Sequence, residues 1–338
     1  MRIGLMYDGF SPFPAALGLI RKADELGLDS VWIAEHILYR DALTPAMAVL
    51  GETRRLAVVP TAVSPYARHP VLIAMTLATL AERAPGRVRA VLGTGQPDDL
   101  EAIGLEPVRP LRTMKEALRV VRSALAGEAG LGHPGAARGV KERRLDFPPV
   151  SPVPLYLAAV GPGMLRLAGK DADGALFSGG CSPAYVRWGA ESVREGAREA
   201  GKRPEETMIA SVVAASLSSD REAAYRVVRR TLAFILRGPH HARSLELSGA
   251  RLDREALADA VARGDWARAE GLIGDEVIRS HSVSGDEGEF RERLAEFSAA
   301  GLDVAVLLLQ GSPGDRMRAL EAAARMQGES PSRCAGGG

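Results

Sequence analysis

The stretch SVWIAEHILYRDALT, residues 30–44, joins an apolar run to two ionisable groups. Residues 30–34 predict a buried strand, and residues 44–52 predict a helix. Glu35 and His36 stand directly after the strand. A carboxylate and an imidazole beside buried residues are costly unless they have partners or a ligand. The stretch therefore predicts either a functional edge at the end of this strand or a polar cluster that satisfies the following loop.

The same alternation of short apolar runs and helix-period segments continues along the chain. The expected strands are residues 2–6, 30–34, 56–63, 88–93, 153–160, 174–179, 208–216 and 304–310. Nearly all are apolar on both faces, which is typical of parallel strands covered by helices. Eight strand–helix units in one chain predict an α/β fold of the closed (β/α)8 TIM barrel type.

Two segments interrupt this rhythm. Residues 127–150 contain Gly, Arg and Pro with little periodicity and predict a surface loop. Residues 217–286 follow the seventh expected strand and contain additional helical patterns. An insertion after a barrel strand lies over the carboxyl-terminal face, so we expect a lid there. We predict one barrel domain over residues 1–328, including this insertion, and a disordered tail at residues 329–338.

Composition narrows the class of partner. The net charge is +1 and 46% of the residues are hydrophobic, which argues against a nucleic-acid or membrane partner recruited by bulk charge. No apolar run approaches 18 residues and no signal peptide is recognisable. The two cysteines, Cys181 and Cys334, lie far apart in the sequence, so neither a disulfide framework nor a zinc site is expected. These features predict a soluble cytoplasmic protein.

Four other strand ends are built from small residues. They read TAVSPY (61–66), GTGQ (93–96), AAVGPG (158–163) and SGGCS (178–182). Small residues let the main chain approach a ligand closely. Four such strand ends in register predict a binding site for a flat, phosphorylated ligand. Each of the last two segments leads into a helix, where backbone N–H groups suit a phosphate.

Several segments together resemble the luciferase-like flavin and deazaflavin superfamily. They are VWIAEH (31–36), AVSPYARHP (62–70), GRVRAVLGTG (86–95), RPLRTMKEALRVVRSALAG (109–127), PVPLYLAAVGPGMLRLAGKDADGALFSG (152–179) and AGLDVAVLL (300–308). Within it, the chain is most similar to the coenzyme F420-dependent oxidoreductases of the methylenetetrahydromethanopterin reductase type. The resemblance implies hydride transfer between F420 and a small metabolite at a C=N, C=C or alcohol/carbonyl group, in a homodimer.

The resemblance also implies roles for individual residues. His36 would lie near the reactive ring as general acid or base, with Glu35 as its acidic neighbour. A cis peptide bond not involving proline is implied at Thr61–Ala62 or one residue later, behind the ring. The implied cofactor contacts are Thr61, Ala62, Val63, Gly93, Thr94, Gly95, Ala158, Ala159, Val160, Gly161, Gly179 and Gly180. The resemblance does not fit the sugar-phosphate-oxidising relatives, which often have Glu where this chain has Gly95.

Position along the chain adds four expected substrate contacts and excludes a metal. Tyr7 and Asp8 end the first strand, Gln96 follows the fourth, and His281 stands close to the rim. His240 and His241 are adjacent on a helix and point to different sides, so no metal site is expected. Two alternatives remain: an FMN-dependent monooxygenase that uses reduced flavin and oxygen, and a barrel that binds flavin without turnover.

Overall fold

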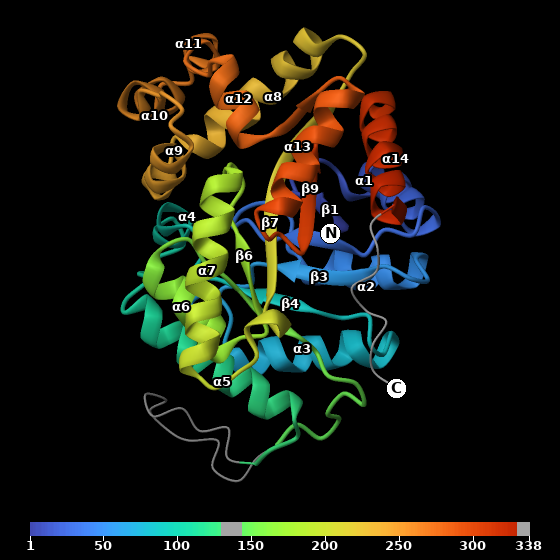
Figure 1. Ribbon diagram of the computed structural model, residues 1–338. Helices are drawn as coiled ribbons and strands as arrows, with labels where there is room; N and C mark the ends of the chain where they lie inside the picture. The colour runs from blue at the N-terminus through green and yellow to red at the C-terminus, as the bar shows by residue number, and fades with distance from the viewer. Residues whose placement is uncertain (130–143, 330–338) are drawn as a thin grey trace.

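The computed structural model describes residues 1–129 and 144–329, and strands and helices alternate through most of the chain (Figure 1). The first elements are β1 (Arg2–Tyr7), α1 (Phe13–Glu25), β2 (Ser30–Ala34), α2 (Leu43–Glu52), β3 (Ala57–Thr61), α3 (Pro70–Arg83), β4 (Ala90–Leu92), α4 (Pro97–Glu101), α5 (Pro110–Leu125), β5 (Leu155–Ala158), α6 (Pro162–Asp171), β6 (Gly174–Phe177) and α7 (Pro183–Glu199). They are followed by β7 (Met208–Leu217), α8 (Arg221–Leu236), α9 (Ala242–Ser248), α10 (Arg254–Ala262), α11 (Trp266–Gly271), α12 (Asp275–His281), β8 (Val283–Gly285), α13 (Glu287–Ala299), β9 (Val304–Leu309) and α14 (Pro313–Glu329).

The strands form one parallel sheet in the order β3-β2-β1-β9-β7-β6-β5-β4. The two ends of this order meet through two isolated parallel bridges, Val58 to Val88 and Val63 to Leu92. Eight strands thus form a nearly closed barrel, which confirms the predicted (β/α)8 fold. The additional strand β8 pairs with the end of β7 and lies off the barrel path. It was not predicted because its three residues, VSG, contain no apolar run.

Side chains alternate between the inside of the barrel and the layer under the helices, as the two-residue period of a strand requires. Val31 and Ile33 belong to the large core between sheet and helices, whereas Trp32 belongs to the barrel interior. The interior cluster consists of Trp32, Val59, Val91, Tyr156, Leu176, Met208, Ala210, Val212, Val304 and Val306. This packed interior fills the barrel below its rim, so a ligand at the carboxyl-terminal face would lie on top of the interior cluster.

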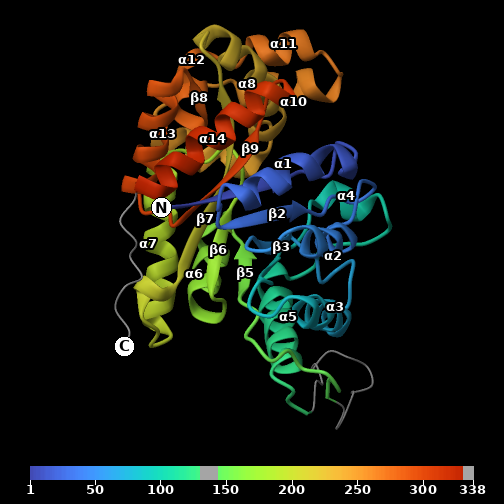
Figure 2. The same ribbon diagram turned by 90° about the vertical axis from the view of Figure 1, so that its right-hand side faces the viewer.

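The insertion after β7 builds a second, smaller core. Helices α8 to α12 gather at one end of the molecule in both views, above the end of β7 (Figures 1 and 2). The buried apolar side chains of α8, α10, α11 and α12 form one cluster, which includes Ala214 of β7 and Leu232 of α8. The insertion is therefore anchored on the strand from which it departs. None of the described helices combines the length and apolar character that a membrane crossing requires.

One local feature confirms a prediction, and two others show how helices begin. The Thr61–Ala62 peptide bond is cis. Asp286 and Glu289 form a capping box at the start of α13, and the His69 side chain caps α3 by accepting a hydrogen bond from the Val71 N–H at 3.2 Å. Helix α4 was not predicted. Residues 130–143 of the predicted loop and residues 330–338 of the predicted tail lie outside the described residues.

Candidate functional site

The floor of the barrel mouth is made of small or flexible apolar side chains. Met6, Ala62, Ala158 and Leu308 pack on the interior cluster from above and are half-buried. They come from strands on opposite sides of the barrel, and they leave its upper surface apolar and partly exposed. A flat apolar ring can be placed against such a surface.

Three predicted cofactor-binding residues come together on this floor. A Cβ added at Gly93 would lie 2.8 Å from the Cβ of Ala62 and 3.1 Å from the Cβ of Ala158. Because real Cβ atoms essentially never approach at 2.8 Å, position 93 accepts glycine alone without rearrangement. The ends of β3, β4 and β5 therefore form a shelf of bare main chain and methyl groups, and the cis peptide bond lies at its edge.

Other predicted cofactor contacts face elsewhere. The side chains of Val63 and Ala159 belong to the core under the helices and are 0% and 1% exposed. Thr61 is also buried, and its hydroxyl donates to the Val59 carbonyl at 2.8 Å. The side chains of Val63 and Ala159 therefore point away from the mouth, and the hydroxyl of Thr61 is bonded within the protein. The main chain of these residues remains the part that can border a ligand.

The segment after β4 forms one wall of the mouth. Ser64 donates a hydrogen bond to the Thr94 carbonyl at 3.0 Å, which ties the end of β3 to this segment. Gly95 has a φ of +80°, a conformation that favours glycine. Gln96 is exposed and precedes α4 without capping it through its side chain. Thr94, Gly95 and Gln96 thus remain accessible at the rim.

The segments after β5 and β6 offer backbone donors. Val160 is fixed by a hydrogen bond from the Tyr185 hydroxyl to its carbonyl. A Cβ at Gly161, which precedes α6, would meet no described atom within 4 Å, so this backbone is open. In the described part of the chain, the N–H groups of Gly179, Gly180 and Cys181 have no hydrogen-bond partner. Free N–H groups before a helix suit an anion.

His36 lies in an aromatic cluster at the mouth. Its ring stacks on Phe10 with centroids 4.9 Å apart and an interplanar angle of 17°. Phe10 in turn meets the edges of Tyr39 and Phe234, at centroid distances of 4.8 and 6.4 Å. Burial lowers the pKa of His36 below the ordinary value for histidine, and the carboxylates of Asp99 and Asp8 oppose this shift. The imidazole is therefore neutral near pH 7.

Glu35 does not orient His36, contrary to its predicted role as the partner of the histidine. Its carboxylate accepts a hydrogen bond from the Ala42 N–H at 3.3 Å and lies 4.0 Å from the guanidinium of Arg68. No hydrogen bond joins Glu35 to His36 in the described structure. Successive residues of an extended chain point to opposite sides, which accounts for this separation. Burial raises the pKa of Glu35.

Two predicted substrate contacts are enclosed by protein. Tyr7 faces the core under the helices, and its hydroxyl donates to the Ser11 carbonyl at 2.7 Å. His281 is 1% exposed, and both ring nitrogens have protein partners. Neither side chain reaches the mouth, so the prediction that Tyr7 and His281 contact substrate is wrong. Asp8 is half-buried beside the mouth and accepts a hydrogen bond from the Phe10 N–H at 3.1 Å.

Four further residues at the mouth were not among the predicted site residues. Ser178 and Gln310 follow Leu176 and Leu308 by two residues, so the strand period already placed them on the inner face. Phe10 and Phe234 were not found because they come from a loop and from the insertion, where no periodicity connects them to the barrel. The Thr231 hydroxyl donates to the Gln310 side chain at 3.0 Å, which ties α8 to the rim.

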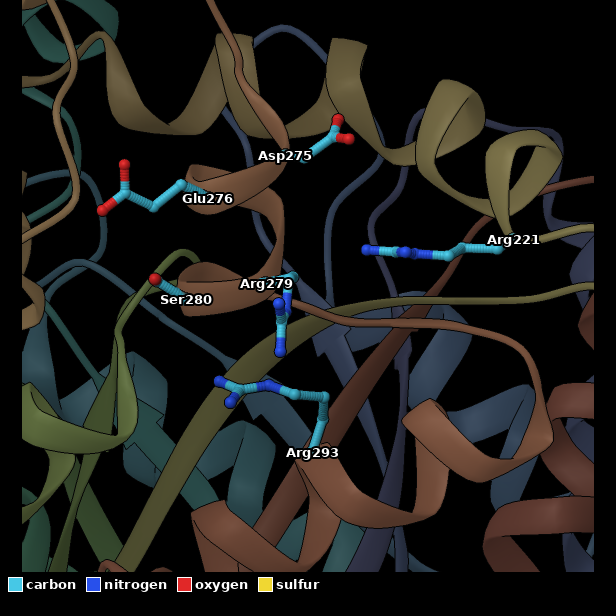
Figure 3. Close-up of a pocket in the computed structure, with 6 residues that line it drawn as sticks. All are labelled: Arg221, Asp275, Glu276, Arg279, Ser280 and Arg293. Atoms are coloured by element: carbon cyan, nitrogen blue, oxygen red, sulfur yellow. The ribbon is translucent and has the colours of Figure 1, made fainter.

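Two surface hollows lie away from this mouth. One, of about 390 Å³, is lined by Arg221, Asp275, Glu276, Arg279, Ser280 and Arg293 (Figure 3). Its charges are largely paired: Arg229 binds Asp275 at 2.6 Å and Arg221 binds Glu289 at 3.1 Å. The other hollow, of about 410 Å³, lies between α2 and α3. Neither contains a predicted cofactor contact. Among the described residues, no group of three His, Cys, Asp or Glu side chains could hold a metal ion.

Comparisons with known proteins agree with this geometry. A 5,10-methylenetetrahydromethanopterin reductase of Archaeoglobus fulgidus is 31% identical over 299 residues, covering 87% of this chain and 88% of its own. The F420-dependent tetrahydromethanopterin reductase of Methanopyrus kandleri superposes with a TM-score of 0.83 at 26% identity, covering 96% of this chain and 97% of its own. An F420-dependent secondary alcohol dehydrogenase shares the fold, with a TM-score of 0.78 at 23% identity over 96% of this chain and 97% of its own. The family profile described as luciferase-like monooxygenase matches residues 2–304. The chain belongs to the luciferase-like monooxygenase family.

Proposed function

We propose that the protein is an F420-dependent oxidoreductase that transfers hydride between the deazaflavin and a C=N, C=C or alcohol/carbonyl group of a small molecule. The shelf at Ala62, Gly93 and Ala158 carries this proposal, because it fits a flat tricyclic ring held against bare main chain. The reductase of Archaeoglobus fulgidus and the F420-dependent reductase of Methanopyrus kandleri support it.

The residues that would hold the cofactor divide into two groups. Ala62, Gly93 and Ala158 would support the ring, with Thr94 and Gly95 along its edge. The N–H groups of residues 179–181 and the open backbone at Gly161 would receive the phosphate arm, since they are donors without partners at the starts of α7 and α6. A deazaflavin, when bound, supplies a hydride donor or acceptor that reacts poorly with oxygen.

His36 would handle the proton that accompanies hydride transfer. Its neutral imidazole accepts a proton from a substrate hydroxyl in the oxidation direction and returns it in the reverse direction. The stacked ring of Phe10 holds the imidazole plane and keeps water from one of its faces. Asp8, Thr94, Gln96 and the missed Ser178 would border the substrate.

A flavin monooxygenase is the second candidate, because the family profile takes its name from such enzymes. Its chemistry would place FMN on the same shelf and require oxygen. A barrel that binds a flavin without turnover is the third. The first candidate would turn over F420, the second would turn over FMN with oxygen, and the third would turn over neither. Activity measurements therefore separate the three candidates.

The test is a pair of activity screens on purified protein. Oxidation of reduced F420 is followed by absorbance with imines, enones and ketones, and oxygen uptake is followed with reduced FMN. The proposal predicts oxidation of reduced F420 with at least one acceptor class and no oxygen uptake. Oxygen uptake with FMN and no oxidation of reduced F420 would contradict it. Tight binding without turnover in either screen would favour the third candidate.

A homodimer is also part of the proposal. Leu72 and Met75 of α3 and Met47 of α2 are 51%, 40% and 36% exposed, and Met47 shares a hollow with residues of α3. Clustered exposed apolar side chains are typical of a subunit interface. Light scattering on the wild type should give the mass of a dimer, and Leu72→Glu combined with Met75→Glu should give a monomer. A monomeric wild type would contradict this.

A further inference from the structure

The insertion is joined to the loop between β6 and α7 by a buried polar cluster. The Ser182 N–H donates to the Ser244 hydroxyl at 2.9 Å, and the Ser182 hydroxyl donates to the Ser244 carbonyl at 3.3 Å. Ser182 also caps α7 by accepting from the Tyr185 N–H at 3.2 Å. The same loop carries Gly179 and Gly180, the free donors of the proposed phosphate site.

His281 occupies the centre of this cluster. Its Nδ1 lies 2.8 Å from the Gly180 carbonyl oxygen, and its Nε2 lies 3.1 Å from the Ser248 hydroxyl. A carbonyl can only accept, so Nδ1 carries the proton and donates to Gly180. In the neutral ring, Nε2 then accepts from the hydroxyl of Ser248. The histidine thus bridges α9 and the loop after β6 from the end of α12.

The surroundings seal this contact from water. His281 and Ser244 are each 1% exposed. A Cβ at Gly180 would lie 2.9 Å from side-chain carbons of both Ile235 and Leu236, so the end of α8 lies directly on the loop. The Ser244 hydroxyl also lies 3.4 Å from the Gly180 carbonyl oxygen, so His281 supplies the shorter of two contacts, and solvent could not replace it.

The contact fixes the orientation of one peptide unit. The Gly180–Cys181 bond is trans, so its carbonyl and its N–H point in opposite directions. The carbonyl is held toward the insertion, and the Cys181 N–H therefore points away from the polar cluster. Gly180 has a φ of +73° and no side chain, so its own conformational preference fixes the peptide only weakly.

We infer that His281 is a positioning residue, which holds the Gly180–Cys181 peptide so that its N–H faces the phosphate arm of the cofactor. The inference rests on the proposed function, since it assumes that the loop after β6 receives that arm. His281 belongs to the insertion and is remote from the reacting atoms, yet it would control the affinity for the cofactor. The insertion is thereby part of the binding site and not only a cover over it.

Three variants test this inference. His281→Asn keeps an amide N–H at the place of Nδ1 and preserves the bond to Gly180. His281→Gln places its amide at the position of Nε2, so it keeps the contact with Ser248 and loses the bond to Gly180. His281→Leu loses both. F420 affinity is measured by fluorescence quenching, and amide hydrogen exchange of residues 178–182 is measured on the protein without cofactor.

The inference predicts a specific order among the variants. His281→Gln and His281→Leu should weaken F420 binding about tenfold or more, with kcat at saturating F420 nearly unchanged. Exchange of residues 178–182 should be faster in both, while exchange in the barrel strands stays as in the wild type. His281→Asn should remain within about threefold of the wild type in affinity.

Two results would overturn the inference. One is a His281→Leu protein that binds F420 as the wild type does. The other is equal loss in the Asn and Gln variants with faster exchange across the whole of residues 221–285, which would indicate only that the histidine stabilises the insertion. If the wild type binds no F420, the proposed function fails. The exchange at residues 178–182 then decides by itself whether His281 holds the peptide.

Discussion

The Cα of Gly93 lies so close to the methyl group of Ala62 that a Cβ added to the glycine would stand 2.8 Å from the methyl carbon. Ala158 closes the other side at 3.1 Å. Three neighbouring strands therefore end in the smallest side chains that the packing allows. In the proposed function, this contact creates the surface on which the deazaflavin ring lies.

Gly93→Ala should damage both stability and cofactor binding. The additional methyl group has no space, so the free energy of unfolding should fall by about 1–3 kcal/mol, and F420 affinity should fall at least tenfold. Gly18→Ala in α1 is the matched control, because its Cβ would meet no described atom within 4 Å and the residue lies outside the proposed site. Urea denaturation should show no loss of stability for this control. A Gly93→Ala protein that binds F420 normally would show that the shelf is not the ring site.

His36→Gln should separate chemistry from binding. Removing a general acid or base costs about 10²- to 10⁴-fold in rate, whereas F420 affinity should change little. Since burial lowers the pKa of His36, the wild-type kcat/KM for oxidation should stay constant around pH 7 and fall only below pH 6.5, where the imidazole becomes protonated. This fall should be absent in the variant. Full activity of His36→Gln would remove the assignment.

Glu35→Gln should leave the rate within about twofold of the wild type, because Glu35 contacts Ala42 and Arg68 and not His36. The carboxyl group of Glu35 should also make the stability of the wild-type protein depend on pH. A carboxyl group whose pKa is raised on folding favours the folded state while it is protonated, and this contribution is lost as the pH rises through the raised pKa. The stability of the variant relative to the wild type should therefore increase as the pH rises above the ordinary carboxyl pKa of about 4.5. A large loss of kcat in Glu35→Gln would instead show that Glu35 takes part in catalysis.

His281 should make the protein sensitive to mild acid. Burial lowers its pKa to about 4, whereas a histidine in the unfolded chain titrates near 6.5. The unfolded chain binds the additional proton between these values, so stability is complete above about pH 6.5 and falls as the pH decreases toward 4. The loss attributable to this group is about 3 kcal/mol at its greatest. Urea denaturation across this range should give a shallower pH dependence for His281→Asn. Equal slopes would contradict the assignment.

The barrel could be predicted because each of its eight strands is a short apolar run that is recognisable in the local sequence. Residues 30–34 are bounded identically in the prediction and in the structure, since an apolar run followed by Glu35 and His36 leaves little freedom in where the strand ends. Strand β8 and helix α4 were missed because three and five residues carry too little periodicity. The cis bond at Thr61–Ala62 came from the family resemblance and not from any local pattern.

The site was predicted less completely for two reasons. The side of the sheet to which a side chain points at a strand end, and its contacts with residues distant in the sequence, are not set by the local sequence. Val63 and Ala159 were correctly placed at strand ends, but the two-residue period directs their side chains under the helices. His281 was expected at the rim, and the packing of α12 against the loop after β6 buried it. Phe10 and Phe234 come from the loop after β1 and from α8 of the insertion, and no pattern in the sequence reveals that they contact each other.

Equilibrium titration of the wild type with F420 and, separately, with FMN tests the central claim most directly. Fluorescence quenching should show saturable binding of F420 at one site per chain, at least tenfold tighter than FMN, and Gly93→Ala should weaken it. Saturable binding of FMN without binding of F420, or a titration unaffected by the alanine at position 93, would contradict the claim that this shelf holds a deazaflavin.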